Sequence, residues 1–496
     1  MEKISTKDYD QKTKESLIWN TMLPVAFQVF RFAIAIVTAR ILDPKDFGIM
    51  GMASIIIYYA NSISNFGFSN AIVQRKTIDS RHINSIFVIN LVISIFLTLL
   101  ILLTAESLAE FFQVEELLYV FYAFSSIFLI TAFYTVPVTL LRRELDYKEV
   151  SKIEFLRGAV QSVSALIFAM LGWQYFALVS GLILSNLVAT IWIQSKVTWR
   201  PSLNFDKQAV SDIFNFSVWN FAVTQIRLLN DYVDKLIIGK FLGPILLGYY
   251  EKAFSISFMP VDILGNRISG VMFSSFARQQ EDRQKLVAYL EKSLVLLSTL
   301  CFPIFIGIFT VTPIFVTTLL GEKWEPMIVP LKILLMAMLV GSLANQVSVM
   351  NISTGNYKSQ IRRRAICLVL FTTACLSLVH YGINTIAAVY LGYQVLFLVL
   401  SFQLTKKELS VSWLIMLRNI WPALGGTLVM AAAITTLKVF IFPRTTFLNL
   451  VILTFTGVCL YSASQFVFRC HQNEFLLDEV LAMVNKFRKR IRMALS

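Results

Sequence analysis

The sequence predicts an all-α polytopic membrane protein with about fourteen transmembrane helices. Of its 496 residues, 56% are hydrophobic and only 15% are charged. A soluble domain averages roughly 45–50% apolar and about 25% charged residues. The mean hydropathy is +0.68. The apolar runs are continuous rather than alternating, which excludes a transmembrane β-barrel. The same composition excludes a disordered chain and an ordinary soluble enzyme.

Each apolar run is long enough to cross about 30 Å of hydrocarbon. The spans are expected at 17–38, 47–72, 83–105, 117–141, 153–171, 173–194, 213–238, 246–272, 286–311, 327–351, 364–381, 383–404, 412–436 and 446–468. The loops between them are short. The sequence therefore leaves no room for a soluble catalytic or nucleotide-binding domain among these loops.

The distribution of loop charges predicts the orientation of the bundle. The chain has 44 Lys plus Arg against 30 acidic residues, a net charge of +14. Cytoplasmic loops of membrane proteins collect Lys and Arg, so this excess indicates a membrane topology rather than a nucleic-acid partner. With the amino terminus inside, the inside loops are the basic ones, for example at Arg142 and Arg143. We therefore expect both termini in the cytoplasm, with no removable signal peptide before the first span.

The chain repeats itself. Residues 19–53 align without gaps with residues 219–253, so that Pro44 and Gly48 match Pro244 and Gly248. Later the offset becomes 210, and Asp146-Tyr147-Lys148, Gly172 and Ala177 match Asn356-Tyr357-Lys358, Gly382 and Ala387. Spans 1–6 and 7–12 are therefore expected to form two parallel, pseudo-symmetric six-helix lobes, an architecture typical of transporters. The alternative is a chance similarity of loop residues.

This repeat predicts a division of the chain into six parts. They are an N-terminal cytoplasmic segment 1–16, an N-lobe 17–195, a cytoplasmic interlobe loop 196–212, a C-lobe 213–404, two further spans in 405–470, and a basic tail 471–496. The tail has the pattern of an amphipathic helix with Lys and Arg on its polar face. Such a helix anchors at the surface of anionic lipids.

Several stretches of the chain resemble a known family. They are Ala39 to Gly48 (ARILDPKDFG), Phe66 to Ala71 (FGFSNA), Asp234 to Tyr250 (DKLIIGKFLGPILLGYY) and Leu320 to Trp324 (LGEKW). Together they resemble the Wzx-type polysaccharide flippases of the MOP superfamily, which are related to the MATE transporters. The resemblance is strongest to the subgroup that exports polymers such as colanic acid or teichuronic acid.

The resemblance implies two six-helix lobes around a central cavity, with two accessory helices at the C-terminal end. It also implies a location in the bacterial cytoplasmic (inner) membrane and a substrate of the undecaprenyl-pyrophosphate type that carries an oligosaccharide repeat unit for lipopolysaccharide or exopolysaccharide synthesis. Polysaccharide polymerases and glycosyltransferases are the expected partners. One departure concerns the first span, which lacks the acidic residue that some related drug exporters use for cation coupling.

Ionisable residues inside the predicted spans are the main candidates for a binding site, because each costs about 2.5–3.5 kcal/mol to insert into the membrane. The candidates for binding a pyrophosphate or its surroundings are Arg31, Arg227, Asp231, Asp234, Lys235, Lys252 and Arg267. Asp231, Glu251 and Asp262 are candidates for ion coupling. Asn220, Thr224, Arg227, Asp231 and Asp234 recur at spacings of three and four and so share one helical face. The alternative for these residues is internal pairing, such as Arg227 with Asp231 one turn away.

A second polar face is expected on the span at 47–72. Tyr58, Asn61, Asn65 and Ser69 lie three or four residues apart. The first three could bind neutral sugars through an aromatic face and amides. The alternative is polar packing between helices. The five cysteines form no C-x-x-C pair and no zinc motif, so neither a metal nor a cofactor is expected.

The sequence therefore predicts a flippase that moves a lipid-linked oligosaccharide by alternating access and catalyses no reaction. One alternative is a MATE-like drug or cation antiporter, which would need an acidic pocket. A second is a flippase for a peptidoglycan lipid precursor, which these residues separate poorly from the first function. A third, of a different class, is a membrane polysaccharide polymerase or glycosyltransferase, for which a large outside loop with catalytic residues would be expected.

Overall fold

The computed structural model describes residues 27–28, 30–65, 69, 72–73, 78–441 and 446–468, without the side chains of residues 65, 212–220, 222–223, 227 and 466–468. Within these ranges the regular structure is entirely helical. The predicted segments 1–16 and 471–496 lie outside the described residues, as does most of the first half of the predicted span 17–38.

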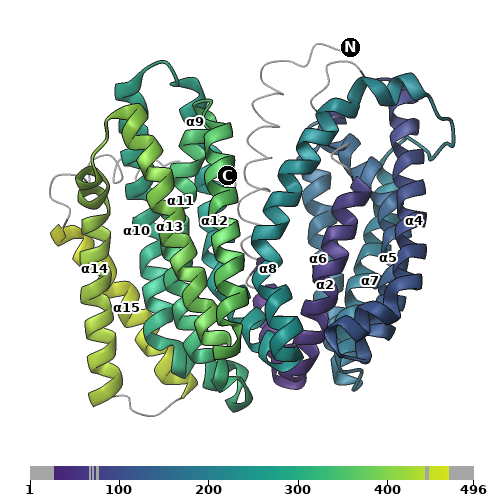
Figure 1. The fold of residues 1–496 in the computed structure, drawn as a ribbon. Helices are drawn as coiled ribbons and strands as arrows, with labels where there is room; N and C mark the ends of the chain where they lie inside the picture. Colours follow the sequence, from purple (N-terminus) through teal and green to yellow (C-terminus); the bar gives the residue numbers. More distant parts are fainter. Residues whose placement is uncertain are drawn as a thin grey trace, which may run out of the picture. The chain divides into compact units, whose positions relative to one another are not determined.

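The helices follow one another with short connections (Figure 1). After a helix over residues 30–41 come α2 (Pro44–Asn65), α4 (Ser80–Phe112), α5 (Glu116–Arg143), α6 (Tyr147–Met170), α7 (Tyr175–Lys196) and α8 (Lys207–Pro260). Next are η1 (Val261–Gly265), α9 (Asn266–Arg278), α10 (Arg283–Phe315), η2 (Val316–Leu320), η3 (Glu322–Met327) and α11 (Ile328–Ser353). The last are α12 (Tyr357–Leu378), η4 (Val379–Tyr381), α13 (Ile383–Leu409), α14 (Trp413–Phe440) and α15 (Phe447–Phe468).

Eleven helices of the described chain are long and apolar enough to cross a membrane. They coincide with eleven of the predicted spans, namely all except the first, seventh and eighth. The first falls partly outside the described residues. The seventh and eighth belong to α8, whose charged residues, among them Asp234 and Lys235, lower its apolar character. The prediction of an all-α polytopic membrane protein is confirmed.

α8 is interrupted at Gly243, where φ is 82° and ψ is 178°. This glycine divides α8 into a first arm, residues 207–242, and a second arm, residues 244–260. A positive φ favours glycine because it has no Cβ. Pro244 follows it, and proline suits the first turn of a helix. The break lies between the predicted spans 213–238 and 246–272. The second of these spans differs from the structure, since a short π-helical segment, η1, separates α8 from α9.

The chain divides into two compact units. The first unit comprises Met1–Lys252 and Thr372–Ile386. In it α4 packs on α5, α6 packs on α7, and α2 contacts α4, α5 and α7. Clusters of buried aliphatic and aromatic residues hold these helices together, for example around Ile86, Phe87 and Val136. The first unit contains most of the predicted site residues.

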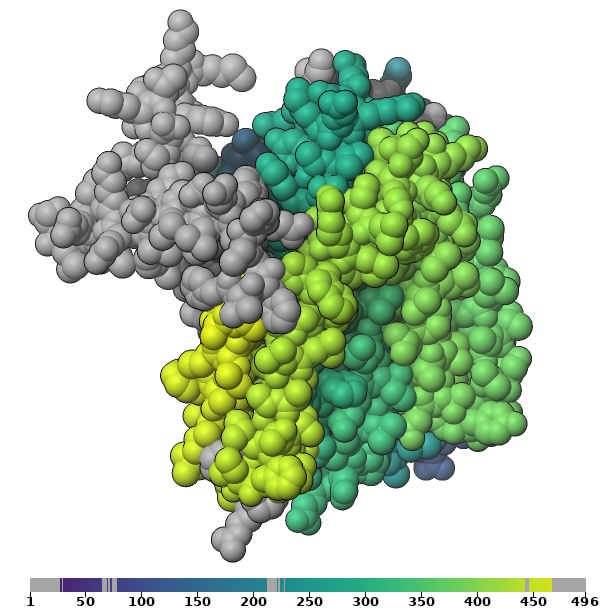
Figure 2. All heavy atoms as spheres, turned by 90° about the vertical axis from the view of Figure 1, so that its left-hand side faces the viewer, coloured from purple at the N-terminus to yellow at the C-terminus, as the bar shows by residue number. Residues whose placement is uncertain are grey.

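The second unit comprises Ala253–Phe371 and Ala387–Ser496. Its centre is α10, which packs against α11, α14 and α15. The last two helices lie side by side on one face (Figure 2). The Tyr461 hydroxyl on α15 donates to the carbonyl of Thr299 on α10 at 2.9 Å. The two helices that follow the predicted lobes are therefore packed onto the bundle rather than separate from it.

The predicted repeat recurs in the backbone conformation. Before α6, Leu145 has a φ of 60°, and at the equivalent position before α12 Gly355 has a φ of 89°. Each is followed two residues later by the first residue of a helix, Tyr147 or Tyr357. The matched glycines that follow α6 and η4, Gly172 and Gly382, have φ values of 81° and 91°. These turns follow the offset of 210, which supports two copies of one structural unit. The predicted domain limits themselves stay a prediction.

Candidate substrate-binding site

Two buried charged residues tie the two arms of α8 together within the first unit. Asp234 is 1% exposed and Lys235 is 7% exposed. The Tyr250 hydroxyl donates to the Asp234 carboxylate at 2.7 Å. The Lys235 ammonium lies 2.7 Å from the Glu251 carboxylate. A buried charge is tolerated when it is paired and hydrogen-bonded, and both partners come from the second arm because the chain turns at Gly243.

An aromatic pair lies beside these ion pairs. The rings of Tyr58 on α2 and Tyr232 on α8 are stacked, with centroids 5.4 Å apart. The Lys235 ammonium lies 5.2 Å from the centroid of Tyr232. Tyr58 is 47% exposed. A ring supported on one side and open on the other is suited to stack on a sugar.

One amide of the polar face predicted on α2, that of Asn61, contacts a neighbouring helix. Asn61 accepts a hydrogen bond from the Thr131 hydroxyl at 3.4 Å. The Gln225 amide on α8 donates to Ser62 at 2.8 Å. These contacts correspond to polar packing between helices, which was the alternative to sugar binding. The side chains of Asn65 and Arg227 lie outside the described residues.

Lys252 contacts both the helix over residues 30–41 and α2. Its ammonium donates to the carbonyl of Ala35 at 3.3 Å and lies 4.6 Å from the centroid of Phe47. A carbonyl dipole and an aromatic face both attract a cation. Lys252 therefore links the second arm of α8 to the helix over residues 30–41.

Arg31 is exposed, and its guanidinium lies 5.8 Å from the centroid of Phe27. No acidic side chain pairs with it among the residues that the structure describes. Asp231 is also exposed and interacts electrostatically with Tyr59 and Lys235. The remaining candidates, Asp262 and Arg267, belong to the second unit, where both are exposed.

A further charged pair was not among the predicted site residues. Arg157 and Glu154 on α6 form an ion pair of 2.7 Å. The Tyr134 hydroxyl on α5 donates to Glu154 at 3.1 Å, and Arg157 lies 5.7 Å from the centroid of the Tyr134 ring. Both residues lie within the predicted span 153–171, and α6 extends from Tyr147 to Met170.

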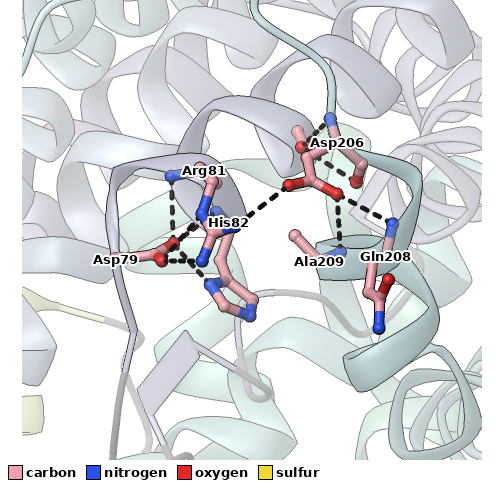
Figure 3. A network of polar contacts seen from close by, with 7 residues as sticks. Asp79, Arg81, His82, Asp206, Gln208 and Ala209 are labelled. Carbon is pink, nitrogen blue, oxygen red and sulfur yellow. Dashed lines mark hydrogen bonds and ion pairs between the residues drawn. The ribbon is translucent and has the colours of Figure 1, made fainter.

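The predicted interlobe loop is anchored to the start of α4 by a polar network (Figure 3). Asp206 accepts hydrogen bonds from the backbone N–H groups of Gln208 and Ala209 at 2.9 and 3.2 Å, which caps α8. Its carboxylate lies 3.6 Å from the guanidinium of Arg81. Its backbone N–H donates to the Ser85 hydroxyl at 2.8 Å. This network fixes the point at which the chain enters α8.

Asp79 completes the network as the N-terminal cap of α4. It accepts hydrogen bonds from the backbone N–H groups of Arg81 and His82 at 3.1 and 3.2 Å. Side-chain hydrogen bonds, first from His82 and then from Arg81, hold the pKa of the Asp79 carboxyl well below its ordinary value. Both partners stabilise the ionised form of the carboxyl. The carboxylate therefore stays charged at neutral pH.

No three His, Cys, Asp or Glu side chains come together as a metal site in the described chain. The chemistry that the arrangement supports is binding. Exposed Arg31 and Tyr58 offer a cation and an aromatic face, while Asp234 is hydrogen-bonded to Tyr250 and Lys235 pairs with Glu251.

Comparisons with known proteins bear on this arrangement. A family model described as "Polysaccharide biosynthesis protein" matches residues 37–329, more than half of the chain. The lipopolysaccharide biosynthesis protein WzxC of Escherichia coli (strain K12) is 26% identical over 342 residues, which cover 68% of this chain and 69% of that protein. The teichuronic acid biosynthesis protein TuaB of Bacillus subtilis (strain 168) is 25% identical over 268 residues, 54% of this chain and 56% of that protein.

Two solved structures share the fold. The lipid II flippase MurJ, in an inward closed conformation, has a TM-score of 0.72 at 12% identity and covers 90% of this chain and 99% of its own. A multidrug resistance MATE family transporter of the MOP superfamily, in an inward-facing conformation, has a TM-score of 0.61 at 13% identity and covers 77% and 94%. The expected MATE-like fold is confirmed by these similarities. The match over residues 37–329 shows that the chain belongs to the polysaccharide biosynthesis protein family.

Proposed function

We propose that this protein moves polyprenyl-diphosphate-linked oligosaccharide repeat units from the cytoplasmic to the outer leaflet of the bacterial cytoplasmic membrane. The observation that carries the proposal is the group of charged and aromatic side chains on α2 and α8 of the first unit, in a chain of a polysaccharide biosynthesis family. Each charge placed in lipid costs about 2.5–3.5 kcal/mol. Such a group is expected where water or a polar headgroup replaces lipid.

The residues divide by what they contact. Asp234, Lys235 and Glu251 pair with their neighbours and hold the two arms of α8 in place. Arg31 and Tyr58 are exposed and act on the headgroup. The guanidinium of Arg31 binds the diphosphate by charge-assisted hydrogen bonds, and the ring of Tyr58 stacks on a sugar.

Lys252, Arg227 and Arg267 are further candidates for the diphosphate, and Asn61 and Asn65 for the sugars. Asp231, Glu251 and Asp262 are candidates for coupling to an ion gradient. Glu251 is the least suited of the three to this role, because its carboxylate already binds Lys235.

The transport mechanism is alternating access, in which the N-lobe 17–195 and the C-lobe 213–404 change their relative arrangement. The headgroup crosses through the polar region while the polyprenyl tail remains in lipid. The protein forms and breaks no covalent bond of the substrate. The driving force is an ion gradient or consumption of the product by a polymerase on the far side of the membrane.

Both termini are placed in the cytoplasm, together with the interlobe loop 196–212. Lys and Arg in that loop obey the positive-inside rule. Glycosyltransferases on the same side supply the lipid-linked repeat unit, and the basic tail 471–496 rests on the anionic leaflet.

The proposal is tested by deletion and complementation in the organism that carries the gene. Deletion should abolish one surface polysaccharide and cause lipid-linked repeat units to accumulate inside the cell. The wild-type gene should restore export, while Arg31→Ala should not, although the variant protein reaches the membrane. Unchanged surface polysaccharide with increased sensitivity to cationic drugs would favour the antiporter instead.

A further inference from the structure

We propose that Arg157 and Arg31 together bind the diphosphate of the substrate. In the absence of substrate, Glu154 forms an ion pair with Arg157, and the diphosphate displaces the Glu154 carboxylate when it binds. This inference rests on the proposed function, because it identifies the groups that recognise the headgroup. It adds a residue pair on α6 that lies outside the charges of α8.

The contacts of Arg157 place it on the side of α6 that faces other helices of the first unit. It lies ten residues after the start of α6 at Tyr147, which corresponds to about 15 Å along the helix. Its guanidinium lies over the ring of Tyr134 on α5 and interacts electrostatically with Tyr58 on α2. Because it meets two other helices of the same unit, Arg157 faces the inside of this bundle and not lipid.

Arg31 approaches the same patch of α6. A Cβ built on Gly158 would lie 3.5 Å from Cδ of Arg31 and 2.6 Å from the ring of Phe27. Glycine at this position therefore lets the helix over residues 30–41 come close to α6. Arg31 also interacts electrostatically with Tyr58. The two guanidinium groups thus lie around one exposed tyrosine, although they are more than one hundred residues apart in sequence.

Glu154 balances only part of this charge. It pairs with Arg157 at 2.7 Å, and the side chains are 35% and 37% exposed. A pair so open exchanges its partner more readily than a buried one, since water or a ligand can reach both groups. The guanidinium groups of Arg31 and Arg157 and the carboxylate of Glu154 together carry a net charge of +1. Arg31 has no acidic partner among the described residues, so an anion is the missing component.

A diphosphate suits this arrangement better than a single carboxylate. It offers several oxygens along its length, and each guanidinium can bind two of them in a planar fork. The hydroxyl of Tyr58 can donate a further hydrogen bond. An acidic sugar of the repeat unit would present the same kind of oxygen, so the experiment must separate the two sources.

The test measures binding to the purified full-length protein in lipid nanodiscs. The probes are geranylgeranyl diphosphate, geranylgeranyl monophosphate and glucuronate, each without the rest of the substrate. The wild-type protein should bind the diphosphate more tightly than the monophosphate and bind glucuronate weakly. Tighter binding of glucuronate than of the diphosphate would overturn the assignment to the lipid diphosphate.

Variants distinguish a role of Arg157 in binding the substrate from a purely structural role. Arg157→Gln should weaken diphosphate binding about tenfold or more, and Arg157→Lys should weaken it less. Glu154→Gln should tighten binding, because it removes the internal competitor. A purely structural pair predicts no tightening. The double variant Glu154→Gln with Arg157→Gln leaves no charge unpaired, so it should fold and still bind weakly.

The pair Glu149 and Lys152 supplies a matched control. It lies on the same helix with the same spacing of three residues, and its side chains are 19% and 38% exposed. Lys152→Gln should leave diphosphate binding unchanged within about twofold. An equal loss of affinity for the diphosphate in Lys152→Gln and in Arg157→Gln would show a general effect of positive charge and would overturn the proposal.

The outcome can be separated from that of the proposed function by measuring transport in the same variants. If the wild type moves lipid-linked oligosaccharide across liposomes while Arg157→Gln binds and moves it equally well, the assignment of Arg157 fails and the proposed function stands. If the wild type moves none, the proposed function itself fails.

Discussion

Gly248 lies so close to the backbone carbonyl of Pro44 that no Cβ would fit between them. The equivalent contact in the other copy is equally close, since a Cβ on Gly48 would overlap the backbone carbonyl of Pro244. These four residues are matched by the sequence repeat at an offset of 200. The two copies therefore meet through equivalent positions at the first turns of α2 and of the second arm of α8. Small residues permit such backbone contact between membrane helices.

The first prediction concerns this contact. Gly48→Ala and Gly248→Ala should each destabilise the protein by about 1–3 kcal/mol, the usual cost of overpacking, and should reduce export. The measurement is thermal unfolding of purified protein together with complementation of a deletion strain. The control is Gly392→Ala on α13, where a Cβ would meet nothing within 4 Å. Alanine there should be neutral or stabilise by up to about 1 kcal/mol. Wild-type stability and export in both contact variants would show that the backbones need not touch.

The second prediction concerns the pair between Lys235 and Glu251. Glu251→Gln leaves the ammonium of Lys235 buried without its carboxylate, and the protein should lose about 3 kcal/mol of stability. The double variant Lys235→Met with Glu251→Gln should recover most of that loss, because neither side chain of the pair is then charged and Asp234 keeps the hydrogen bond from Tyr250. Unfolding midpoints of the four proteins give the interaction energy.

An exposed ion pair provides the comparison for this cycle. Lys285 and Asp282 are 62% and 41% exposed in their side chains, and Lys285→Gln should change stability by less than about 1 kcal/mol. A double variant of Lys235 and Glu251 that is no more stable than Glu251→Gln alone would show that the pair is not the source of the stability.

The fold could be predicted largely from the sequence because membrane spans leave a simple signal. Long apolar runs mark the eleven helices that are apolar enough to cross a membrane. The turn glycines Gly172 and Gly382 were recognisable because a positive φ restricts the choice of residue. The span at 246–272 was predicted as one helix, but the π-helical segment η1 interrupts it. Apolarity alone does not distinguish an α-helical turn from a π-helical one.

The contacts of the site were harder to predict. Asp234 and Lys235 could be identified as charges within a span, but their partners Tyr250 and Glu251 depend on the sharp turn at Gly243. Such a turn brings residues together that no helical spacing relates. Arg157 lies within the predicted span 153–171, so its charge was visible in the sequence, but its contact with Tyr134 depends on how α5 packs against α6.

The third prediction concerns Arg31 and Asp231, which occupy equivalent positions in the two copies. Arg31→Ala should reduce export about tenfold or more while the protein level in the membrane stays unchanged, because no described residue pairs with this cation. Arg31→Lys should retain part of the activity, since an ammonium cannot replace a bidentate fork. Export is measured as surface polysaccharide in a complemented deletion strain.

A double variant decides whether Arg31 serves the substrate or a partner. Arg31→Ala with Asp231→Ala should remain inactive. Full recovery of export in this double variant would show that the two residues form a structural pair and that the diphosphate binds elsewhere.

The fourth prediction concerns topology. Reporter fusions should read cytoplasmic after Arg143, Arg200 and Arg364, and outside after Asp43, Gly243 and Glu322. The expectation follows from the excess of Lys and Arg in the first set of loops. Reversal of two or more of these positions would contradict the model of two parallel copies, because equivalent turns would then lie on opposite sides.

The central claim is transport without chemistry, and the most direct measurement uses purified protein in liposomes that contain a fluorescent polyprenyl-diphosphate-linked oligosaccharide. The fraction accessible to an external glycosidase or lectin is followed over time, and the lipid is then recovered for mass spectrometry. The protein should equilibrate the oligosaccharide between the leaflets, Arg31→Ala should slow this exchange strongly, and the mass of the recovered lipid should be unchanged. Equal rates with and without the protein, or a new glycosidic bond in the recovered lipid, would contradict the account.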